Sequence, residues 1–193
     1  VARAVELHEE RAAQAGALLG REAVLCADAL AGVEIAPEAF GLLWLNPPYH
    51  AGQFELDFLM AHTPLLCAGG ILCLVVPQPS LRVLAEHLAA WYTTLTCYKF
   101  PEPDYAAYKQ VVMFGERKPS PLGNPTLAER IRGYADLDAE IPVLGAYGYR
   151  YGVPNTPGPA VFRLRATEAV PPAGGLWDDP EVTKRLWPAL APA

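Results

Sequence analysis

An apolar run of strand length, residues 41–45, ends abruptly at the tetrapeptide Asn46-Pro47-Pro48-Tyr49. Proline lacks the N–H that a β-ladder needs, so the chain must leave the sheet at Asn46. In open α/β sheets, the loops at the carboxyl ends of the strands are where ligands bind. The side-chain oxygen of Asn46 and the carbonyl of Pro47 offer two neighbouring acceptors, which suits an amino group that donates two hydrogen bonds. Tyr49 adds a flat face for stacking on a planar base or amide.

Two earlier segments show a similar pattern, in which an acidic residue follows an apolar strand. Residues 1–7 predict a short buried strand with Glu6 near its end, and a helix is expected after it. Residues 23–27 predict a second buried strand, which Asp28 closes. Glu6 also suits the start of a helix and Asp28 suits a turn cap, so neither acid identifies a site by itself. The order is more specific, because three successive strands are followed by Glu6, Asp28 and Asn46.

This order resembles that of the S-adenosylmethionine-dependent amino-methyltransferases that carry an Asn-Pro-Pro-Tyr motif. The group includes DNA adenine-N6 methyltransferases, RNA adenine enzymes and glutamine methyltransferases that act on release factors. The resemblance covers residues 1–118 and implies an α/β fold with a Rossmann-like class I methyltransferase sheet, mostly parallel with a terminal antiparallel pair. Residues 99–115 look most similar to uncharacterised DNA methylases of phages and mobile elements. The catalytic loop that the resemblance implies consists of Asn46, Pro47, Pro48 and Tyr49.

The resemblance also implies a cofactor, S-adenosyl-L-methionine. The acid that binds the ribose hydroxyls would be Glu6, the acid that accepts a hydrogen bond from the cofactor's adenine would be Asp28, and Asn46 would lie beside both ligands. The family opens with a strand and a glycine-rich loop, roughly Asp-Pro-x-x-Gly-x-Gly, which we find neither before Val1 nor further along the sequence. We therefore expect a fragment of a longer protein, a strand supplied by a partner chain, or a loss of cofactor binding.

Several further elements are predicted as far as residue 118. A helix is expected over residues 8–19, and another over 53–67 that Pro64 kinks or ends. A turn at Gly69-Gly70 leads to residues 71–76, a continuous apolar run typical of a central parallel strand covered on both faces. A third helix over 82–92 precedes two strands at 95–100 and 109–116. In the adenine-N6 enzymes the connection between such strands supplies an aromatic ring that stacks on the extruded base. Here either Tyr105 or Tyr108 could fill that role, and the sequence does not choose between them.

The C-terminal part, residues 119–193, is predicted to be an extension used for substrate recognition or packing. A helix is expected over 127–137, a strand-like end to the segment 145–154, and a short strand over 161–166. Residues 171–193 are rich in Pro and Gly and read as a packed extension or a tail. The catalytic domain is therefore assigned to residues 1–118, incomplete at its N-terminus.

Charge and cysteine content narrow the class of protein. The formal net charge is −6, but residues 95–135 hold six bases and four acids whereas residues 1–57 hold nine acids and three bases. This asymmetry fits an enzyme that touches a polyanion at one edge. No apolar run approaches the roughly 18 residues of a membrane span. Neither the histidines nor the cysteines have metal-ligand spacing, so no metal is expected, and the cysteines read as reduced core residues of a cytoplasmic protein: Cys26, Cys67, Cys73 and Cys97.

The sequence therefore predicts an S-adenosylmethionine-dependent N-methyltransferase that acts on an exocyclic amine, in the first place N6 of adenine in DNA. Two alternatives share the same residues. One is a methyltransferase that acts on RNA or on a protein glutamine, and the other is a non-catalytic binding subunit with a methyltransferase-like fold. The expected partners are DNA, or an RNA or protein substrate, and a chain that supplies the missing strand.

Overall fold

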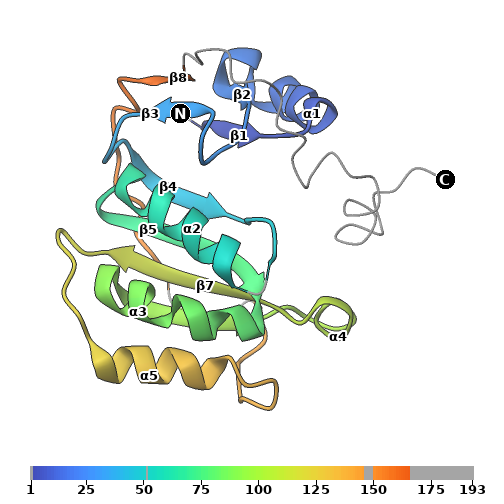
Figure 1. Ribbon diagram of the computed structural model, residues 1–193, viewed down its shortest axis with the longest axis vertical. Helices are drawn as coiled ribbons and strands as arrows, with labels where there is room; N and C mark the ends of the chain where they lie inside the picture. Colours follow the sequence, from blue (N-terminus) through green and yellow to red (C-terminus); the bar gives the residue numbers. More distant parts are fainter. Residues whose placement is uncertain (1, 51, 146–149, 166–193) are drawn as a thin grey trace.

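The apolar run at residues 71–76 lies at the centre of a four-stranded sheet. The computed structural model describes residues 2–50, 52–145 and 150–165. Strand β5 (Leu66–Pro77) pairs in parallel with β4 (Phe40–Leu45) and antiparallel with β7 (Gln110–Arg117), and β7 pairs antiparallel with the outermost strand, β6 (Tyr92–Lys99). Strands β4, β5 and β6 thus run in one direction and β7 runs against them. Figure 1 shows β7 opposed to β4 and β5. The predicted antiparallel pair is confirmed.

Strand β5 is longer than the sequence suggested. Helix α2 (Gln53–His62) ends before Pro64, a short 3-10 turn follows (Thr63–Leu65), and the chain enters the sheet at once. The prediction that Pro64 ends the helix is confirmed, whereas the alternative of a kinked helix that continues to residue 67 is wrong, as is the predicted turn at Gly69-Gly70. Both glycines lie inside the strand, Gly69 at φ +76°, next to a register shift between β4 and β5. A Cβ at Gly70 would stand 2.8 Å from the carbonyl oxygen of Cys67, so this close backbone approach explains the glycine.

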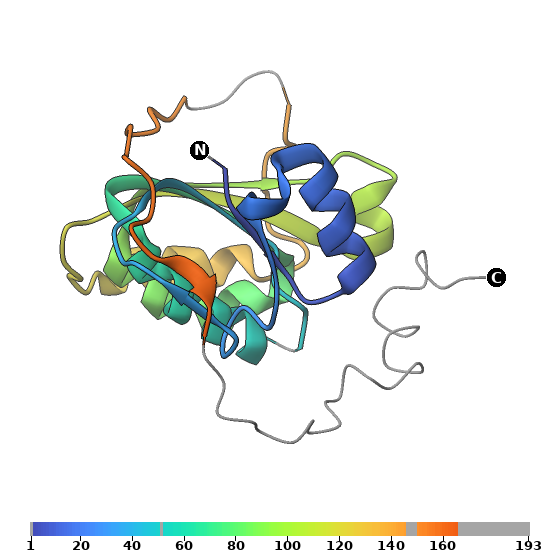
Figure 2. The ribbon, with the colours of Figure 1, turned by 90° about the horizontal axis from the view of Figure 1, so that it is seen from above.

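Helices cover one face of the sheet. Helix α2 lies there together with α3 (Leu81–Trp91) and α5 (Pro125–Tyr134), and Figure 2 shows the three on the same side of the strands. Helix α3 buries one apolar stripe against the sheet, as helical spacing predicts. The fully buried side chains of this core include Leu59, Leu72, Leu74, Leu84, Leu88, Met113 and Ile131.

The opposite face of the sheet is only partly covered. Cys73, Val75 and Val112 are buried there beneath partly buried hydrophobic residues. On β4, however, Leu42 is 48% exposed and Trp44 is 68% exposed. Alternation along the strand places these two side chains opposite Leu43 and Leu45, which join the helix-covered core.

A separate N-terminal unit lies beside β4 (Figure 1). Strand β1 (Ala4–Glu6), helix α1 (Glu9–Leu19), a 3-10 turn (Arg21–Ala23) and strand β2 (Val24–Cys26) form a parallel βαβ pair, as predicted. Strand β3 (Val33–Ile35) was not anticipated, because three residues carry too little periodicity. It pairs antiparallel with β8 (Phe162–Leu164), within the predicted segment 161–166. Residue 166 itself lies outside the described residues.

The remaining predictions have mixed outcomes. The connection between β6 and β7 contains a short helix, α4 (Asp104–Tyr108), where the sequence suggested a loop. Residues 150–154 contain no helix or strand, so the strand-like end expected there is wrong, while residues 146–149 and 171–193 lie outside the described residues. Cys73 and Cys97 are buried, but Cys26 is exposed and is not a core residue. Among the described residues, every helix is too short or too polar to span a membrane.

Candidate functional site

The carboxyl ends of β4 and β5 meet the start of β7 at one edge of the sheet. Asn46 follows β4 directly, and at the end of β5 Pro77 is paired with Gln110, the first residue of β7. Helix α4 projects at this same end of the sheet in Figure 1. Because β7 runs against β5, its first residues join the carboxyl edge, which is where ligands bind in open α/β sheets.

A chain of hydrogen bonds fixes the Asn46 side chain. The Gln110 amide nitrogen donates to the Tyr49 hydroxyl at 2.8 Å, and that hydroxyl donates to Oδ1 of Asn46 at 2.6 Å. Gln110 comes from a strand 61 positions away, and no sequence motif pointed to it. The amide oxygen of Asn46 is therefore held in a defined orientation by a donor on its own loop.

The Tyr49 hydroxyl stays protonated across the physiological range. Burial is the main reason that the pKa of Tyr49 is raised to about 12. The hydrogen bond from Gln110 lowers this pKa, and the negative charge of Glu55 raises it further. Tyr49 was proposed from sequence as a stacking ring. In this structure its ring is half-buried and its hydroxyl is engaged with Asn46. The same residue can hold the amide with its oxygen and present a face with its ring.

The two acceptors expected from the sequence belong to consecutive residues that differ in exposure. Asn46 is exposed, whereas Pro47 is buried and Pro48 is half-buried. Within the described residues, no backbone hydrogen bond reaches the Pro47 carbonyl. The Asn46 oxygen has a second lone pair beyond the one that Tyr49 occupies. Each of these two oxygens can therefore accept a further hydrogen bond.

A buried carboxylate holds the loop that follows. Glu55, on the first turn of α2, is fully buried. Its Oε2 accepts from the backbone N–H groups of His50 and Gly52, both at 3.1 Å, and its Oε1 accepts from the Ser80 hydroxyl at 2.8 Å. Gly52 has φ +89°, and a Cβ there would approach Val83 to 2.9 Å. Sequence reasoning missed Glu55, although an acid three residues into a helix is a known N-terminal capping signal.

The two tyrosines of the β6–β7 connection differ in exposure. Tyr105 is 8% exposed, and its hydroxyl donates to the side-chain oxygen of the buried Gln78. The ammonium groups of Lys99 and Lys109 lie over its ring. Tyr108, one helical turn later, is 54% exposed. Of the two candidates, Tyr108 is the one whose ring is accessible.

The predicted cofactor acids both lie in the N-terminal unit. Oε1 of Glu6 accepts from the His8 backbone and from Arg11, each at 2.8 Å. Burial opposes ionisation of Glu6, but these hydrogen bonds and charges outweigh it and lower the pKa of the carboxyl. Oε2 of Glu6 accepts no hydrogen bond from the described residues. One oxygen of Glu6 is thus positioned by the chain while the other remains available.

Asp28 forms a turn cap. Its Oδ1 accepts from the backbone N–H of Leu30 at 2.8 Å and of Ala31 at 3.4 Å, and its side chain is exposed. This is the alternative role that the sequence left open, and it leaves Oδ2 without a partner among the described residues. Strands β1 and β4 point toward the same side of the molecule in Figure 1, but they belong to separate sheets. The structure therefore brings Asn46, Pro47 and Tyr49 together and keeps Glu6 and Asp28 on a neighbouring unit.

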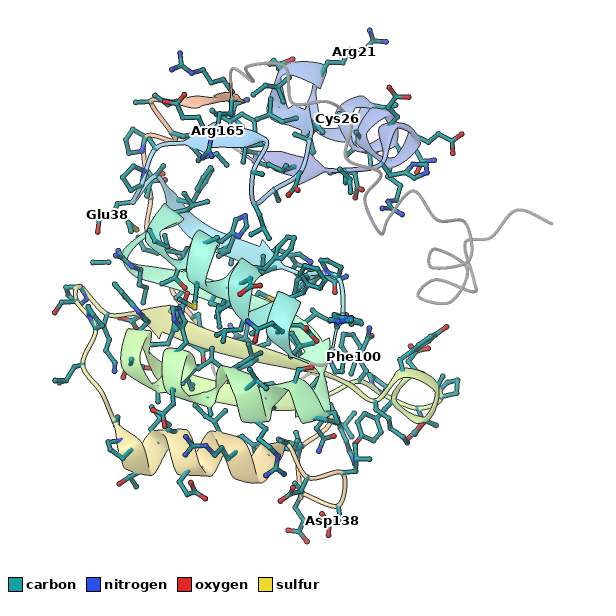
Figure 3. The ribbon with its side chains drawn as sticks, viewed as in Figure 1. Arg21, Cys26, Glu38, Phe100, Asp138 and Arg165 are labelled. Atoms are coloured by element: carbon teal, nitrogen blue, oxygen red, sulfur yellow. The ribbon has the colours of Figure 1, made fainter. Side chains whose placement is uncertain are left out.

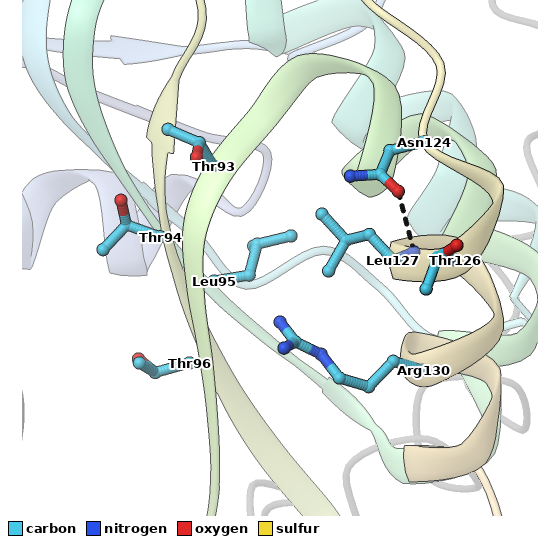
Figure 4. A pocket seen from close by; sticks show the side chains of 8 residues that line it. All are labelled: Thr93, Thr94, Leu95, Thr96, Asn124, Thr126, Leu127 and Arg130. Atoms are coloured by element: carbon cyan, nitrogen blue, oxygen red, sulfur yellow. Dashed lines mark hydrogen bonds between the residues drawn. The ribbon is translucent and has the colours of Figure 1, made fainter.

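A pocket elsewhere in the structure contributes nothing to this site. A pocket of about 530 Å³ lies between β6 and α5, lined by threonines at the start of β6 and by Arg130, and it includes none of the predicted residues (Figure 4). Within the described part of the chain, no group of three His, Cys, Asp or Glu side chains could hold a metal ion.

Comparison with known proteins gives one family and one structural likeness. No curated protein sequence matches this chain. Among solved structures, the chain is similar to a predicted O-methyltransferase, protein Atu636 from Agrobacterium tumefaciens, with 18% identity, a TM-score of 0.40, and coverage of 68% of this chain and 76% of the other. The family model described as "Uncharacterised methyltransferase family (DUF6094)" matches residues 1–156. The chain, which has an α/β sheet with Asn46 at the end of a strand, belongs to this methyltransferase family.

Proposed function

We propose that this enzyme transfers a methyl group from S-adenosyl-L-methionine to an exocyclic amine, and that the amine is N6 of adenine in DNA. One observation carries the proposal. At the carboxyl edge of the sheet, the Asn46 oxygen is oriented by Tyr49 and Gln110, and the residue that follows, Pro47, provides a carbonyl as a second acceptor. Two fixed acceptors and a neighbouring aromatic ring suit a planar group that bears an NH2.

The chemical role of the loop follows from its donors and acceptors. The Asn46 oxygen and the Pro47 carbonyl would each accept one N–H of the amine. Two acceptors on these hydrogens draw the nitrogen toward tetrahedral geometry, so that its lone pair turns away from the ring system. S-adenosyl-L-methionine, when bound, supplies an electrophilic methyl group on a sulfonium. The protein's contribution is then positioning and local electrostatics, and no strong base is needed because the N–H becomes acidic only as the new bond forms.

Glu6 and Asp28 are the residues that would hold the cofactor. Each has one carboxylate oxygen engaged with the chain and one without a partner among the described residues. A carboxylate oxygen suits ribose hydroxyls at Glu6 and an adenine amino group at Asp28. Both acids follow strands of a parallel pair, which is the arrangement expected of a nucleotide site.

We further infer that an additional strand, with a glycine-rich loop, completes the cofactor site between β1 and β4. The backbone of β4 forms no hydrogen bonds with β1 in the described part of the chain. Beside that edge, Leu42 and Trp44 expose apolar surface. A partner chain would supply this strand.

A base in duplex DNA must leave the stack before its N6 can reach Asn46. The ring of Tyr49 and the exposed ring of Tyr108 would stack on such a base. The exposure of Tyr108 and the burial of Tyr105 favour Tyr108 for this role.

The test is transfer of a radiolabelled methyl group from S-adenosyl-L-methionine to an adenine-containing DNA oligonucleotide, with digestion to locate the label on N6. Asn46→Ala should lower the rate by about 100-fold or more, the cost typical of a lost transition-state contact. Asn155→Ala removes an exposed amide elsewhere on the chain and should leave the rate unchanged. Equal rates for wild type and Asn46→Ala, or label on RNA or on a protein glutamine instead, would overturn the assignment.

A further inference from the structure

Two lysines share one aromatic ring at the base of the β6–β7 connection. The Lys99 ammonium lies 5.2 Å from the centroid of the Tyr105 ring, and the Lys109 ammonium lies 4.8 Å from the same centroid. Lys99 ends β6 and Lys109 immediately precedes β7, so the two cations frame the connection that carries α4. Figure 3 marks Phe100, the residue after Lys99, at this end of the sheet.

The Tyr105 ring that both lysines contact is held rigidly. Tyr105 is buried, its hydroxyl donates to Gln78, and Gln78 in turn donates to the backbone carbonyl of Asp136 at 2.5 Å. Gln78 is itself fully buried. The ring therefore forms a fixed support for both ammonium groups, and cation–π attraction favours their placement there.

No carboxylate in the described residues neutralises either lysine. Glu102 and Asp104 belong to the same connection, but Glu102 accepts the backbone N–H of Ala106 and neither acid pairs with a lysine. Two like charges near one ring repel each other, and an anion that contacts both would relieve that repulsion. The pair is thus suited to an anionic ligand.

The backbone of Lys109 adds an independent observation. Lys109 has φ +50° and ψ +36°, in the left-handed region where glycine and asparagine are much more common than lysine. Its N–H donates to the Tyr105 carbonyl at 2.9 Å and its carbonyl accepts from Gln78 at 2.8 Å, so the conformation is fixed on both sides. A long cationic side chain at a position that favours glycine indicates that the side chain is used.

The pair also lies next to the candidate site. The residue after Lys109 is Gln110, whose amide donates to the Tyr49 hydroxyl that holds Asn46. The exposed Tyr108 precedes Lys109. A ligand held by the lysines would therefore have its neighbouring groups within reach of the loop at Asn46.

We propose that Lys99 and Lys109, supported by Tyr105, bind the phosphodiester backbone of the nucleic-acid strand that presents its base to Asn46. This inference rests on the proposed function, because it assigns nucleic acid as the substrate class. The negative net charge of the whole chain is no obstacle, since the contact is confined to one basic pair on one edge.

The experiment measures binding of a fluorescent single-stranded DNA oligonucleotide by anisotropy, over a range of salt concentrations and without cofactor. Each phosphate contact contributes about 0.7 to the slope of log K against log[salt] for a single strand. Lys99→Gln and Lys109→Gln should each reduce the slope by about 0.7, and the double variant by about 1.4. Lys109→Arg should keep the wild-type slope. Lys109→Gly, which removes the charge and suits the left-handed backbone, should bind like Lys109→Gln while unfolding no more easily than wild type.

Arg21→Gln is the matched control. Arg21 is an exposed cation in the N-terminal unit, far from α4, and its removal should leave the slope unchanged (Figure 3). An unchanged slope in the double lysine variant, or an equal loss in Arg21→Gln, would overturn the proposal. An RNA oligonucleotide of the same sequence identifies which nucleic acid the pair prefers.

Binding and methyl transfer separate this inference from the proposed function. Lysine-dependent binding without label on adenine would leave the phosphate site standing and refute adenine methylation. Label on adenine with binding that ignores both lysines would refute the phosphate site alone.

Discussion

The four-stranded sheet and the N-terminal unit are held together in different ways. In the sheet, large side chains such as Leu72, Leu74 and Leu88 are fully buried beneath three helices. In the unit β1–α1–β2, the buried residues are small, namely Ala12, Gly16 and Ala23. Burial of apolar surface stabilises a fold in proportion to its area, so the sheet carries most of the stability.

The candidate site follows the same division. The loop at Asn46 is fixed by Tyr49, Gln110 and Glu55 before any ligand arrives, whereas Glu6 is held mainly by Arg11 at a half-exposed surface. In the proposed function, the loop at Asn46 is the substrate side and is pre-organised, whereas Glu6 on the cofactor side is held less firmly and would gain order from a bound cofactor. Each prediction below changes one side of this comparison.

The largest effect is expected in the core of the sheet. Leu72→Ala removes a fully buried side chain and should lower the free energy of unfolding by about 3 kcal/mol or more. Leu18→Ala, on α1 where the side chain is 86% exposed, should change it by less than about 0.5 kcal/mol. Urea unfolding monitored by tryptophan fluorescence measures both. Similar losses in the two variants would show that the unit contributes as much as the sheet.

Glu55→Gln should come next, at about 2 kcal/mol, because an amide nitrogen would face backbone donors that need an acceptor. The exposed Asp57 gives the control Asp57→Asn, with little expected change. Glu55→Gln should also slow methyl transfer more than it weakens cofactor binding, since Glu55 holds the loop after Asn46. Equal effects on both measurements would contradict a role confined to the substrate side.

Acid should weaken the sheet through His87. Burial lowers the pKa of His87 to about 4, and its Nε2 contacts the Thr63 hydroxyl at 2.9 Å. Between the ordinary histidine pKa of about 6.5 and this value, the unfolded chain binds a proton that the folded chain does not. The part of the stability that depends on neutral His87 is therefore fully present above pH 6.5 and is lost as the pH falls toward 4. Denaturation midpoints across this range should show the decrease. His87→Gln should reduce it, leaving the contribution of His62, whose pKa burial also lowers.

The smallest effect is expected for an ion pair that joins β8 to β3. Arg163 and Glu34 lie 2.9 Å apart on exposed surface, so Arg163→Gln should cost no more than about 0.5 kcal/mol. Hydrogen exchange should show the loss of this ion pair locally. Amide exchange should become faster at Ile35 and Leu164, while the exchange rates along β5 stay unchanged. Faster exchange in β5 as well would mean that the unit and the sheet unfold together.

The sequence predicted those parts of the molecule that depend on neighbouring residues. Strands β1, β2, β4 and β5 could be recognised because apolar runs ended at Glu6, Asp28, Asn46 and Pro77, and three helices followed from their spacing. The missed features depend on distant partners. Gln110 and Glu55 look like ordinary polar residues until folding brings them to Tyr49 and Ser80. Strands β3 and β8 are each three residues long, and each can be recognised as a strand only from its pairing with the other.

The hydrogen bonds from Gln110 to Asn46 have a consequence for chemical selectivity. Since Gln110 already donates to the Tyr49 oxygen, the single hydroxyl proton is directed to Asn46, and only the oxygen end of that amide can receive it. A reversed amide would place its NH2 against this proton. The second lone pair of the Asn46 oxygen and the Pro47 carbonyl are therefore the acceptors of this loop, and the Asn46 NH2 is its donor. In the proposed function these acceptors would bind the amino edge of a base such as adenine, and a glutamine on another strand sets the orientation of the amide that provides one of them.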